Sequence, residues 1–170
     1  MPVGSEPGGG QALYTPEQRL RRDNSRWTLV QGLLAPLQFL VFLVSLCLVL
    51  RYLLTGAGYE AANLSIIVKT LVLYTIMVTG ALWERDVFGV YLFAPAFFWE
   101  DVVSFAVIGL HTVYLVAIFT GWLTPTERML IALAAYATYV VNASQFLMKL
   151  RAARLQAAAP RAGGALELAS

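Results

Sequence analysis

Long apolar stretches separated by short polar segments set the pattern of this sequence. Between Arg26 and Arg51 lie 24 consecutive uncharged residues. As a helix, that stretch would be about 36 Å long, enough to cross a hydrocarbon core about 30 Å thick with some tilt. The pattern predicts four transmembrane helices in all, and the other three cover residues 61–83, 102–123 and 129–150.

The connection between the second and third predicted helices is rich in aromatic residues. Residues 87–99 form an uncharged run that is too short to cross a bilayer. Acidic residues flank both ends of this run. Because a carboxylate is costly in the membrane interior and well tolerated at its surface, these flanks place the run at an interface. We therefore expect an aromatic interfacial or re-entrant segment between the second and third transmembrane helices.

Composition supports an all-α integral membrane fold. Of the 170 residues, 59% are hydrophobic and only 13% are charged, which lies outside the range of soluble domains. We expect a cytoplasmic tail at 1–26 with a short basic amphipathic helix that starts at Thr15 and Pro16. A four-helix membrane domain at 27–150 follows, and then a cytoplasmic, mostly disordered tail at 151–170.

The distribution of basic residues predicts the orientation. Eight Lys or Arg residues lie just before the first span, in the 84–101 connection or just after the last span, against only Arg51 and Arg128 on the other side. Positively charged flanks stay in the cytoplasm. We therefore expect a multi-pass protein with both termini and the acidic connection in the cytoplasm. Residues 1–26 lack the apolar core of a signal peptide, so we expect the first span to be retained.

Charge and cysteine content exclude several classes of function. The net charge is only +2, and the basic residues cluster at the ends of the chain instead of alternating with aromatic residues, which argues against nucleic-acid binding. Cys47 is the one cysteine, so an internal disulfide and a Cys-pair metal or haem motif are excluded.

Four acidic residues around the aromatic run are the catalytic candidates: Glu84, Asp86, Glu100 and Asp101. They could simply be solvated helix ends, since acidic residues are favourable at a helix start. Alternatively, one of them is desolvated by the aromatic residues and stays protonated as a general acid, while a neighbour stays ionised. The aromatic residues are either an interfacial anchor or a flat wall for a planar ligand. They are Phe88, Tyr91, Phe93, Phe97, Phe98 and Trp99.

Polar residues within the spans are further candidates. His111, the only histidine, would lie about 15 Å beyond Asp101 and so near the bilayer midplane. Its candidate roles are a structural hydrogen bond, an axial ligand to the metal of a bound macrocycle, and a proton relay. Lys69 is expected to extend its ammonium group to the nearer interface. Gln31 and Gln38 share a helix face, which favours interhelical hydrogen bonds.

Six runs of sequence are distinctive: WTLVQG (27–32), APLQFLVF (35–42), KTLVLYTIMVTGA (69–81), YLFAPAFFWED (91–101), LHT (110–112) and NASQFL (142–147). They resemble the 3-vinyl bacteriochlorophyllide hydratase family, also called 2-vinyl bacteriochlorophyllide hydratases. These are small membrane enzymes of bacteriochlorophyll synthesis, and the resemblance covers roughly residues 12–155.

The resemblance implies a hydro-lyase that adds water to the 3-vinyl group of a chlorophyllide or bacteriochlorophyllide and yields the 3-(1-hydroxyethyl) pigment. Protonation of the terminal vinyl carbon would leave a cation that the macrocycle delocalises, and water would then add. Glu100 and Asp101 are the first candidates for acid and base, and Glu84 and Asp86 are the second. His111 would contact the ring or bind its magnesium, and the aromatic residues would form the wall.

The same resemblance implies which cofactors, partners and cellular location to expect. Hydration transfers no electrons, so no cofactor is expected and the only metal is the magnesium that the substrate carries. The expected partners are the pigment and membrane lipid, with other pigment-synthesis enzymes and a second copy of this chain as further candidates. The expected location is the bacterial inner or intracytoplasmic membrane. The alternative is a non-catalytic chlorin-binding or assembly protein of the photosynthetic membrane, and a small transporter has less support.

Overall fold

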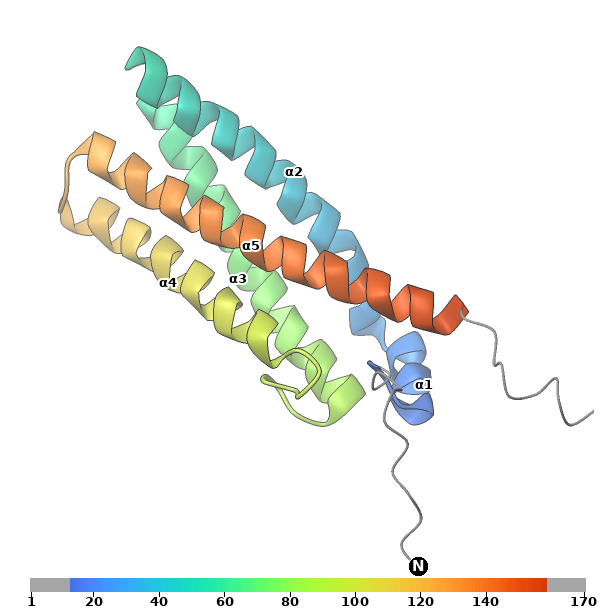
Figure 1. The fold of residues 1–170 in the computed structure, drawn as a ribbon. Coiled ribbons are helices and arrows are strands. Elements are labelled where there is room, and N and C mark those ends of the chain that lie inside the picture. Colours follow the sequence, from blue (N-terminus) through green and yellow to red (C-terminus); the bar gives the residue numbers. More distant parts are fainter. Residues whose placement is uncertain (1–12, 159–170) are drawn as a thin grey trace, which may run out of the picture.

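The computed structural model describes residues 13–158, and every regular element in this range is a helix (Figure 1). The helices are α1 (Pro16–Asn24), α2 (Arg26–Thr55), α3 (Tyr59–Phe88), α4 (Phe98–Thr120) and α5 (Pro125–Ala158). The last four are each long and apolar enough to cross a membrane. The predicted fold class, an all-α integral membrane protein with four transmembrane helices, is confirmed, and the interfacial position of the aromatic segment stays a prediction.

Local sequence explains where the helices begin and end. The Thr15 hydroxyl accepts a hydrogen bond from the Gln18 backbone at 3.2 Å, and the Gln18 side chain accepts one from the Thr15 backbone at 2.9 Å. This reciprocal capping box starts α1 at Pro16, as the sequence predicted. Helix α3 ends at Phe88, and the next residue, Gly89, caps it. The positive φ of Gly89, 82°, favours a residue without a Cβ.

Several helices extend beyond the apolar stretches that predicted them. Helix α2 continues through Arg51, and α3 begins at Tyr59, so only a short turn joins them. Helix α5 continues to Ala158, past the predicted boundary at 150, because the alanine-rich sequence there has high helix propensity. The rest of the predicted tails, at 1–12 and 159–170, lies outside the described residues.

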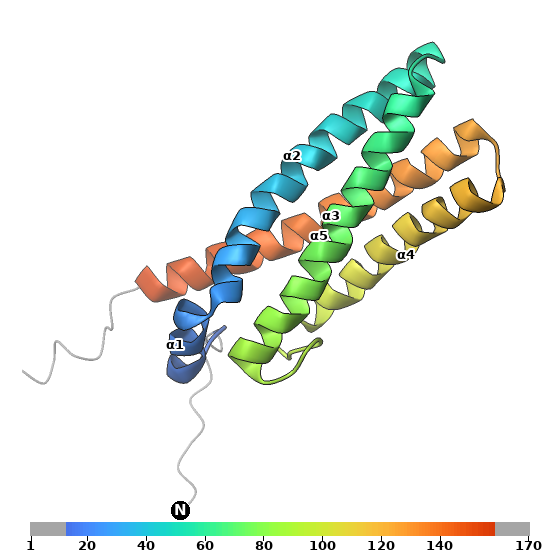
Figure 2. The same ribbon diagram turned by 180° about the vertical axis from the view of Figure 1, so that it is seen from behind.

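The four long helices form an antiparallel bundle of two hairpins, α2 with α3 and α4 with α5 (Figures 1 and 2). Packing within each hairpin is more extensive than packing between them. Helix α1, the loop 89–97 and the end of α5 lie at one end of the bundle, and the two short turns lie at the other. The acidic candidates therefore share one end of the molecule with α1.

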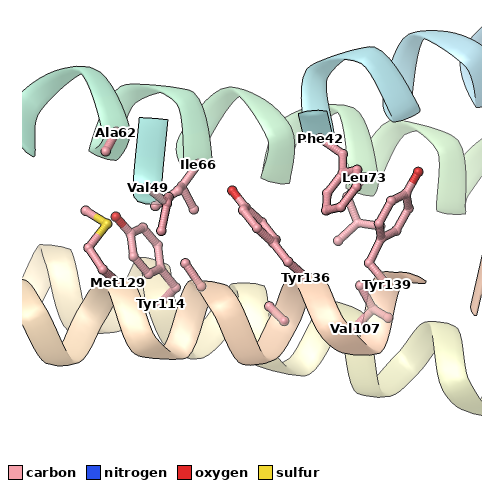
Figure 3. Close-up of a cluster of buried hydrophobic side chains, with 12 residues drawn as sticks. Phe42, Val49, Ala62, Ile66, Leu73, Val107, Tyr114, Met129, Tyr136 and Tyr139 are labelled. Carbon is pink, nitrogen blue, oxygen red and sulfur yellow. The ribbon is translucent and has the colours of Figure 1, made fainter. Parts of the chain in front are cut away.

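Two clusters of buried side chains hold the bundle together. The central cluster joins both hairpins, and in Figure 3 the rings of Tyr136 and Tyr139 project from α5 toward the first hairpin, where Phe42 and Leu73 lie beside Tyr139. A second, smaller cluster of Tyr14, Val87 and Phe97 closes the end that carries α1. Since hydrocarbon lipid gives no hydrophobic driving force between helices, close packing and interhelical hydrogen bonds hold the hairpins together.

Gln31 and Gln38, which share a face of α2, have different surroundings. The Gln31 amide donates to the Thr79 hydroxyl of α3 at 2.7 Å, which confirms the predicted interhelical bond. Gln38 is buried, yet neither its amide nitrogen nor its oxygen has a hydrogen-bond partner within residues 13–158. The prediction of an interhelical hydrogen bond is therefore wrong for Gln38.

Because the two glutamines differ in this way, replacing each with leucine should have different effects on stability. Gln31→Leu should lower the free energy of unfolding by about 0.6–1.7 kcal/mol, because an interhelical hydrogen bond is lost. Gln38→Leu should leave it unchanged or raise it, because a buried group without a partner is replaced by an apolar one. Circular dichroism during SDS titration in mixed micelles measures both. Equal destabilisation by the two variants would contradict the assignment.

Candidate active site

Two carboxyl groups far apart in sequence meet at the end of the bundle that carries α1. Glu84 lies near the end of α3 and Asp101 lies in the first turn of α4. Their side chains are only 5% and 3% exposed, and they are close enough to share a hydrogen bond. We call this arrangement the acid pair.

The acid pair also fixes the course of the loop 89–97. The Phe93 backbone N–H donates to Asp101 Oδ2 at 2.7 Å, and the Ala94 N–H donates to Glu84 Oε2 at 3.1 Å. Phe93 has a φ of 60°, which is uncommon for a residue other than glycine. The two carboxyl groups therefore stabilise a loop conformation that its own backbone disfavours.

Glu100 is buried beside the acid pair but has a different partner. Its Oε2 accepts from Lys149 Nζ of α5 at 2.6 Å, and Lys149 also donates to the Ala96 carbonyl. Consecutive residues on a helix are rotated by about 100°, so Glu100 and Asp101 point in different directions. The structure thus brings Asp101 to Glu84 and holds Glu100 against Lys149, and the catalytic roles of Glu100 and Asp101 stay a prediction.

A groove lies next to the Glu100–Lys149 ion pair. Its volume is about 330 Å³, and it is lined by Leu13, Glu100, Gln145, Met148, Lys149, Ala152 and Ala153. The walls come from α4, α5 and the segment before α1. The groove therefore reaches the buried carboxyl group of Glu100 and not the acid pair.

Asp86 lies apart from the other acidic candidates. It is exposed, and its Oδ2 accepts from the Ser25 hydroxyl at 2.8 Å. Ser25 separates α1 from α2, so this bond ties the α1–α2 junction to the end of α3. The contact explains Asp86 as a structural residue.

The six aromatic candidates do not form one continuous wall. Phe88 and Phe97 turn inward and pack with Tyr14, Trp83 and Phe146. Phe93, Phe98 and Trp99 are exposed and, with Phe105, form an outward-facing aromatic patch. Tyr91 accepts a hydrogen bond from Arg85 at 2.5 Å.

The inward group surrounds a tyrosine that has lost most of its contact with water. Burial raises the pKa of the Tyr14 phenol above its ordinary value, and the nearby Arg22 guanidinium opposes that rise. Tyr14 therefore stays neutral and serves as a packing residue beside the loop 89–97.

His111 is buried in the interior of the bundle on α4. Its Nδ1 lies 2.8 Å from the Val107 carbonyl oxygen. Because a carbonyl oxygen can only accept, the neutral ring carries its proton on Nδ1 and a lone pair on Nε2. That Nε2 atom is buried and has no hydrogen-bond partner among the described residues. The geometry leaves it free to accept a proton or bind a metal.

Lys69 does not extend to the interface, contrary to the prediction. Its side chain is 0% exposed, and Nζ lies 4.0 Å from the centre of the Tyr139 ring. The rings of Tyr136 and Phe42 lie 5.4 Å and 5.7 Å from the same atom. Three aromatic faces attract the cation and hold it inside the bundle.

Buried side-chain atoms without a hydrogen-bond partner occur on all four long helices. Within residues 13–158 they belong to Gln38, Lys69, His111, Asn142 and Gln145, so each of α2, α3, α4 and α5 contributes at least one. Of these residues, only His111 was predicted to have a binding role. The signal for the others was polar residues within apolar spans, but sequence alone could not show which of them would be buried without a partner.

Loss of the Asp101 carboxyl group should loosen the loop 89–97. Asp101→Ala removes the acceptor of the Phe93 N–H, so amide exchange across the loop should become about 10- to 100-fold faster. Asp101→Asn keeps an acceptor oxygen and should remain near wild type. Hydrogen–deuterium exchange with mass spectrometry measures both.

Asp86→Ala is the matched control for that experiment, because its carboxylate bonds Ser25 and not the loop. Exchange at 89–97 should be unchanged in this variant. If Asp101→Ala and Asp101→Asn exchange at the same rate as each other, the Phe93 bond does not stabilise the loop.

Comparison with known proteins identifies the family of the chain. The 2-vinyl bacteriochlorophyllide hydratase family matches residues 14–152. The 2-vinyl bacteriochlorophyllide hydratase of Rhodobacter capsulatus is 67% identical over 163 residues, which is 96% of this chain and 95% of the relative. The protein of the same name from Cereibacter sphaeroides is 72% identical over 143 residues, or 84% of this chain and 89% of the relative. No solved structure matches this chain. The chain belongs to the 2-vinyl bacteriochlorophyllide hydratase family.

Proposed function

We propose that this protein is a hydratase that adds water to the vinyl group of a bacteriochlorophyllide in bacteriochlorophyll synthesis. The observation that carries the proposal is the identity of 67% and 72% to proteins of that name over most of each chain. The four apolar helices place the reaction in a membrane. The pigment substrate and lipid are accordingly its two main contacts.

The reaction needs a proton donor and a proton acceptor in one place. A proton adds to the terminal vinyl carbon, and the positive charge develops on the carbon attached to the macrocycle, where conjugation spreads it. Water adds to that carbon and releases a proton, which leaves a 1-hydroxyethyl group. One proton enters and one leaves, so the group that donated it is restored.

The acid pair meets this requirement. Two buried carboxylates that face each other repel strongly, so the pair is stabilised when it holds one proton between them. The protonated member can donate to the vinyl carbon, and the ionised member can stabilise the cation and accept the proton of water. We therefore assign these roles to Glu84 and Asp101 together.

Glu100 then has a supporting role. Its Oε2 accepts from Lys149 Nζ at 2.6 Å, so this carboxyl group is held in an ion pair and does not join the acid pair. The groove beside this ion pair is lined by Glu100, the residue before Asp101, and we assign to it the approach of water. Glu100 and Lys149 form one wall of that approach.

His111 fits the magnesium of the substrate. The Val107 carbonyl fixes the proton on Nδ1, and the buried Nε2 lone pair is the atom that would coordinate a metal. On a straight helix His111 lies about 15 Å from Asp101, a separation that a macrocycle with its vinyl substituent can bridge. The hydration itself uses no further cofactor, because no electrons are transferred.

The location and partners follow from the same proposal. We place the protein in the bacterial inner or intracytoplasmic membrane, with both termini in the cytoplasm because the basic residues flank that end. The seam between the two hairpins is where a flat ring would enter, since packing is less extensive there. A homodimer, or association with other enzymes of the pathway, would add surface around a pigment held at that seam.

The acid pair predicts which variants lose activity. Glu84→Gln and Asp101→Asn should each lower the rate of hydration by about 100- to 10,000-fold while pigment binding stays close to wild type. The assay uses membranes from a host without the pathway, supplied with vinyl bacteriochlorophyllide. Mass spectrometry of the recovered pigment reports the gain of one water.

Asp86→Asn serves as the control, because Asp86 is exposed and lies away from the pair. It should retain wild-type activity. Pigment that binds to folded wild-type protein but never gains water would contradict the hydratase and favour a non-catalytic chlorin-binding protein. Full activity in Glu84→Gln and Asp101→Asn would remove the acid pair from the mechanism.

His111 makes a separate prediction about the metal. His111→Leu should weaken binding of the magnesium pigment by about tenfold or more, because the coordination bond is lost. Binding of the same pigment without magnesium should change little. Absorption titrations in detergent micelles measure both affinities. An equal loss for the two pigments would mean that His111 packs against the ring without binding the metal.

A further inference from the structure

Lys69 has an unusual environment for a charged side chain in a membrane protein. It is fully buried in α3, inside a helix that is apolar enough to cross the bilayer. Its ammonium group has three N–H donors, and none has a hydrogen-bond partner among the described residues. Such a group is costly to bury, so its presence calls for an explanation beyond packing.

The side chains around Lys69 attract a cation but offer it no anion. Phe42 of α2, with Tyr136 and Tyr139 of α5, present ring faces within 6 Å of Nζ. From α4, His111 is close enough to interact with Lys69 electrostatically, and two positive charges there would repel. Ring faces favour a cation but cannot accept its N–H bonds as a carboxylate does.

The described part of the chain supplies no counter-charge at this depth. The buried acidic residues Glu84, Glu100 and Asp101 all lie at the end of the bundle that carries α1. Fifteen residues separate Lys69 from Glu84, which is about 22 Å along the helix. In the described part of the chain, the ion pairs are Arg22 with Asp23 and Lys149 with Glu100. An anion that pairs with Lys69 would therefore come from outside the described part of the chain.

We propose that Lys69 binds the carboxylate of the substrate. This inference rests on the proposed function, because a bacteriochlorophyllide is the free-acid form of the pigment and carries one ionised side chain. The vinyl group and the acid side chain project from different pyrrole rings, so they point toward different parts of the site. With the vinyl group at the acid pair and magnesium on His111, the acid side chain extends deeper into the bundle.

The position of Lys69 agrees with that placement. The ring of Tyr136 lies 5.9 Å from the His111 ring and 5.4 Å from Lys69 Nζ. His111 and Lys69 therefore flank one side chain, as two contacts to neighbouring parts of one ligand would. The carboxylate would supply the charge-assisted hydrogen bonds that the three aromatic rings cannot.

This assignment makes Lys69 a residue that determines specificity. A pigment whose acid side chain is esterified has no charge to pair with the buried ammonium. It would leave Lys69 without an acceptor and place an uncharged group against it. The enzyme should therefore act on free-acid pigments, and an esterification reaction would follow the hydration and not precede it.

The test compares the vinyl magnesium pigment that carries the free acid with its primary amide, which has the same shape and no charge. Wild-type protein in detergent micelles should bind the acid about 10- to 100-fold more tightly than the amide. Lys69→Met should abolish this preference by weakening acid binding and sparing amide binding. Arg51→Met, which removes an exposed positive charge outside the site, should retain the preference.

The possible outcomes distinguish the proposed role of Lys69 from the proposed hydratase activity. Equal affinity of the wild-type protein for acid and amide would overturn the role of Lys69, and it does so without any variant having to fold. An unchanged preference in folded Lys69→Met would also overturn it. Hydration is read independently from the mass of each bound pigment. Acid preference without any gain of water would leave the Lys69 contact in place and remove the hydratase.

Discussion

Within a bilayer, a polar group must find its partner inside the protein or in a bound ligand, and this constraint sorts the polar side chains of this bundle. Gln31 and Ser45 meet it with bonds to neighbouring helices. Glu84 and Asp101 meet it through each other and through the backbone of the loop 89–97. Lys69, His111 Nε2 and Gln38 do not meet it within the described chain. The polar side chains that stabilise the bundle therefore differ from those to which we assign ligand binding.

The acid pair links the fold of the loop to the chemistry. Its two carboxyl groups hold the Phe93 and Ala94 amides, which keeps Phe93 at a positive φ. The loop in turn covers the carboxyl groups and limits their contact with water. A reaction that ionised both groups for long would leave two buried negative charges repelling each other beside the loop. Returning one proton to the pair at the end of each cycle preserves the structure as well as the catalyst.

The sequence predicted the helices, the capped start of α1 and a group of acidic candidates, because each depends on local pattern. It could not predict which acids would meet. Glu84 reaches Asp101 only because the loop 89–97 folds back, whereas Glu100 is directed to Lys149 of a distant helix. The predicted position of the Lys69 side chain, at the interface, was wrong for a similar reason. Extension to the interface is the default for a lone helix, but Tyr136 and Tyr139 of α5 enclose this lysine.

Depth along the bundle separates two tasks that would interfere if they shared one place. Proton transfer needs access to water, and the acid pair lies at the end of the bundle where a groove reaches Glu100, the neighbour of Asp101. Holding a metal and an anion needs a dry environment, because electrostatic contacts are stronger where water is excluded. His111 and Lys69 lie in that interior, away from the groove. A rigid macrocycle is one of the few substrates that can span both regions, so its own dimensions couple recognition in the interior to chemistry at the end of the bundle.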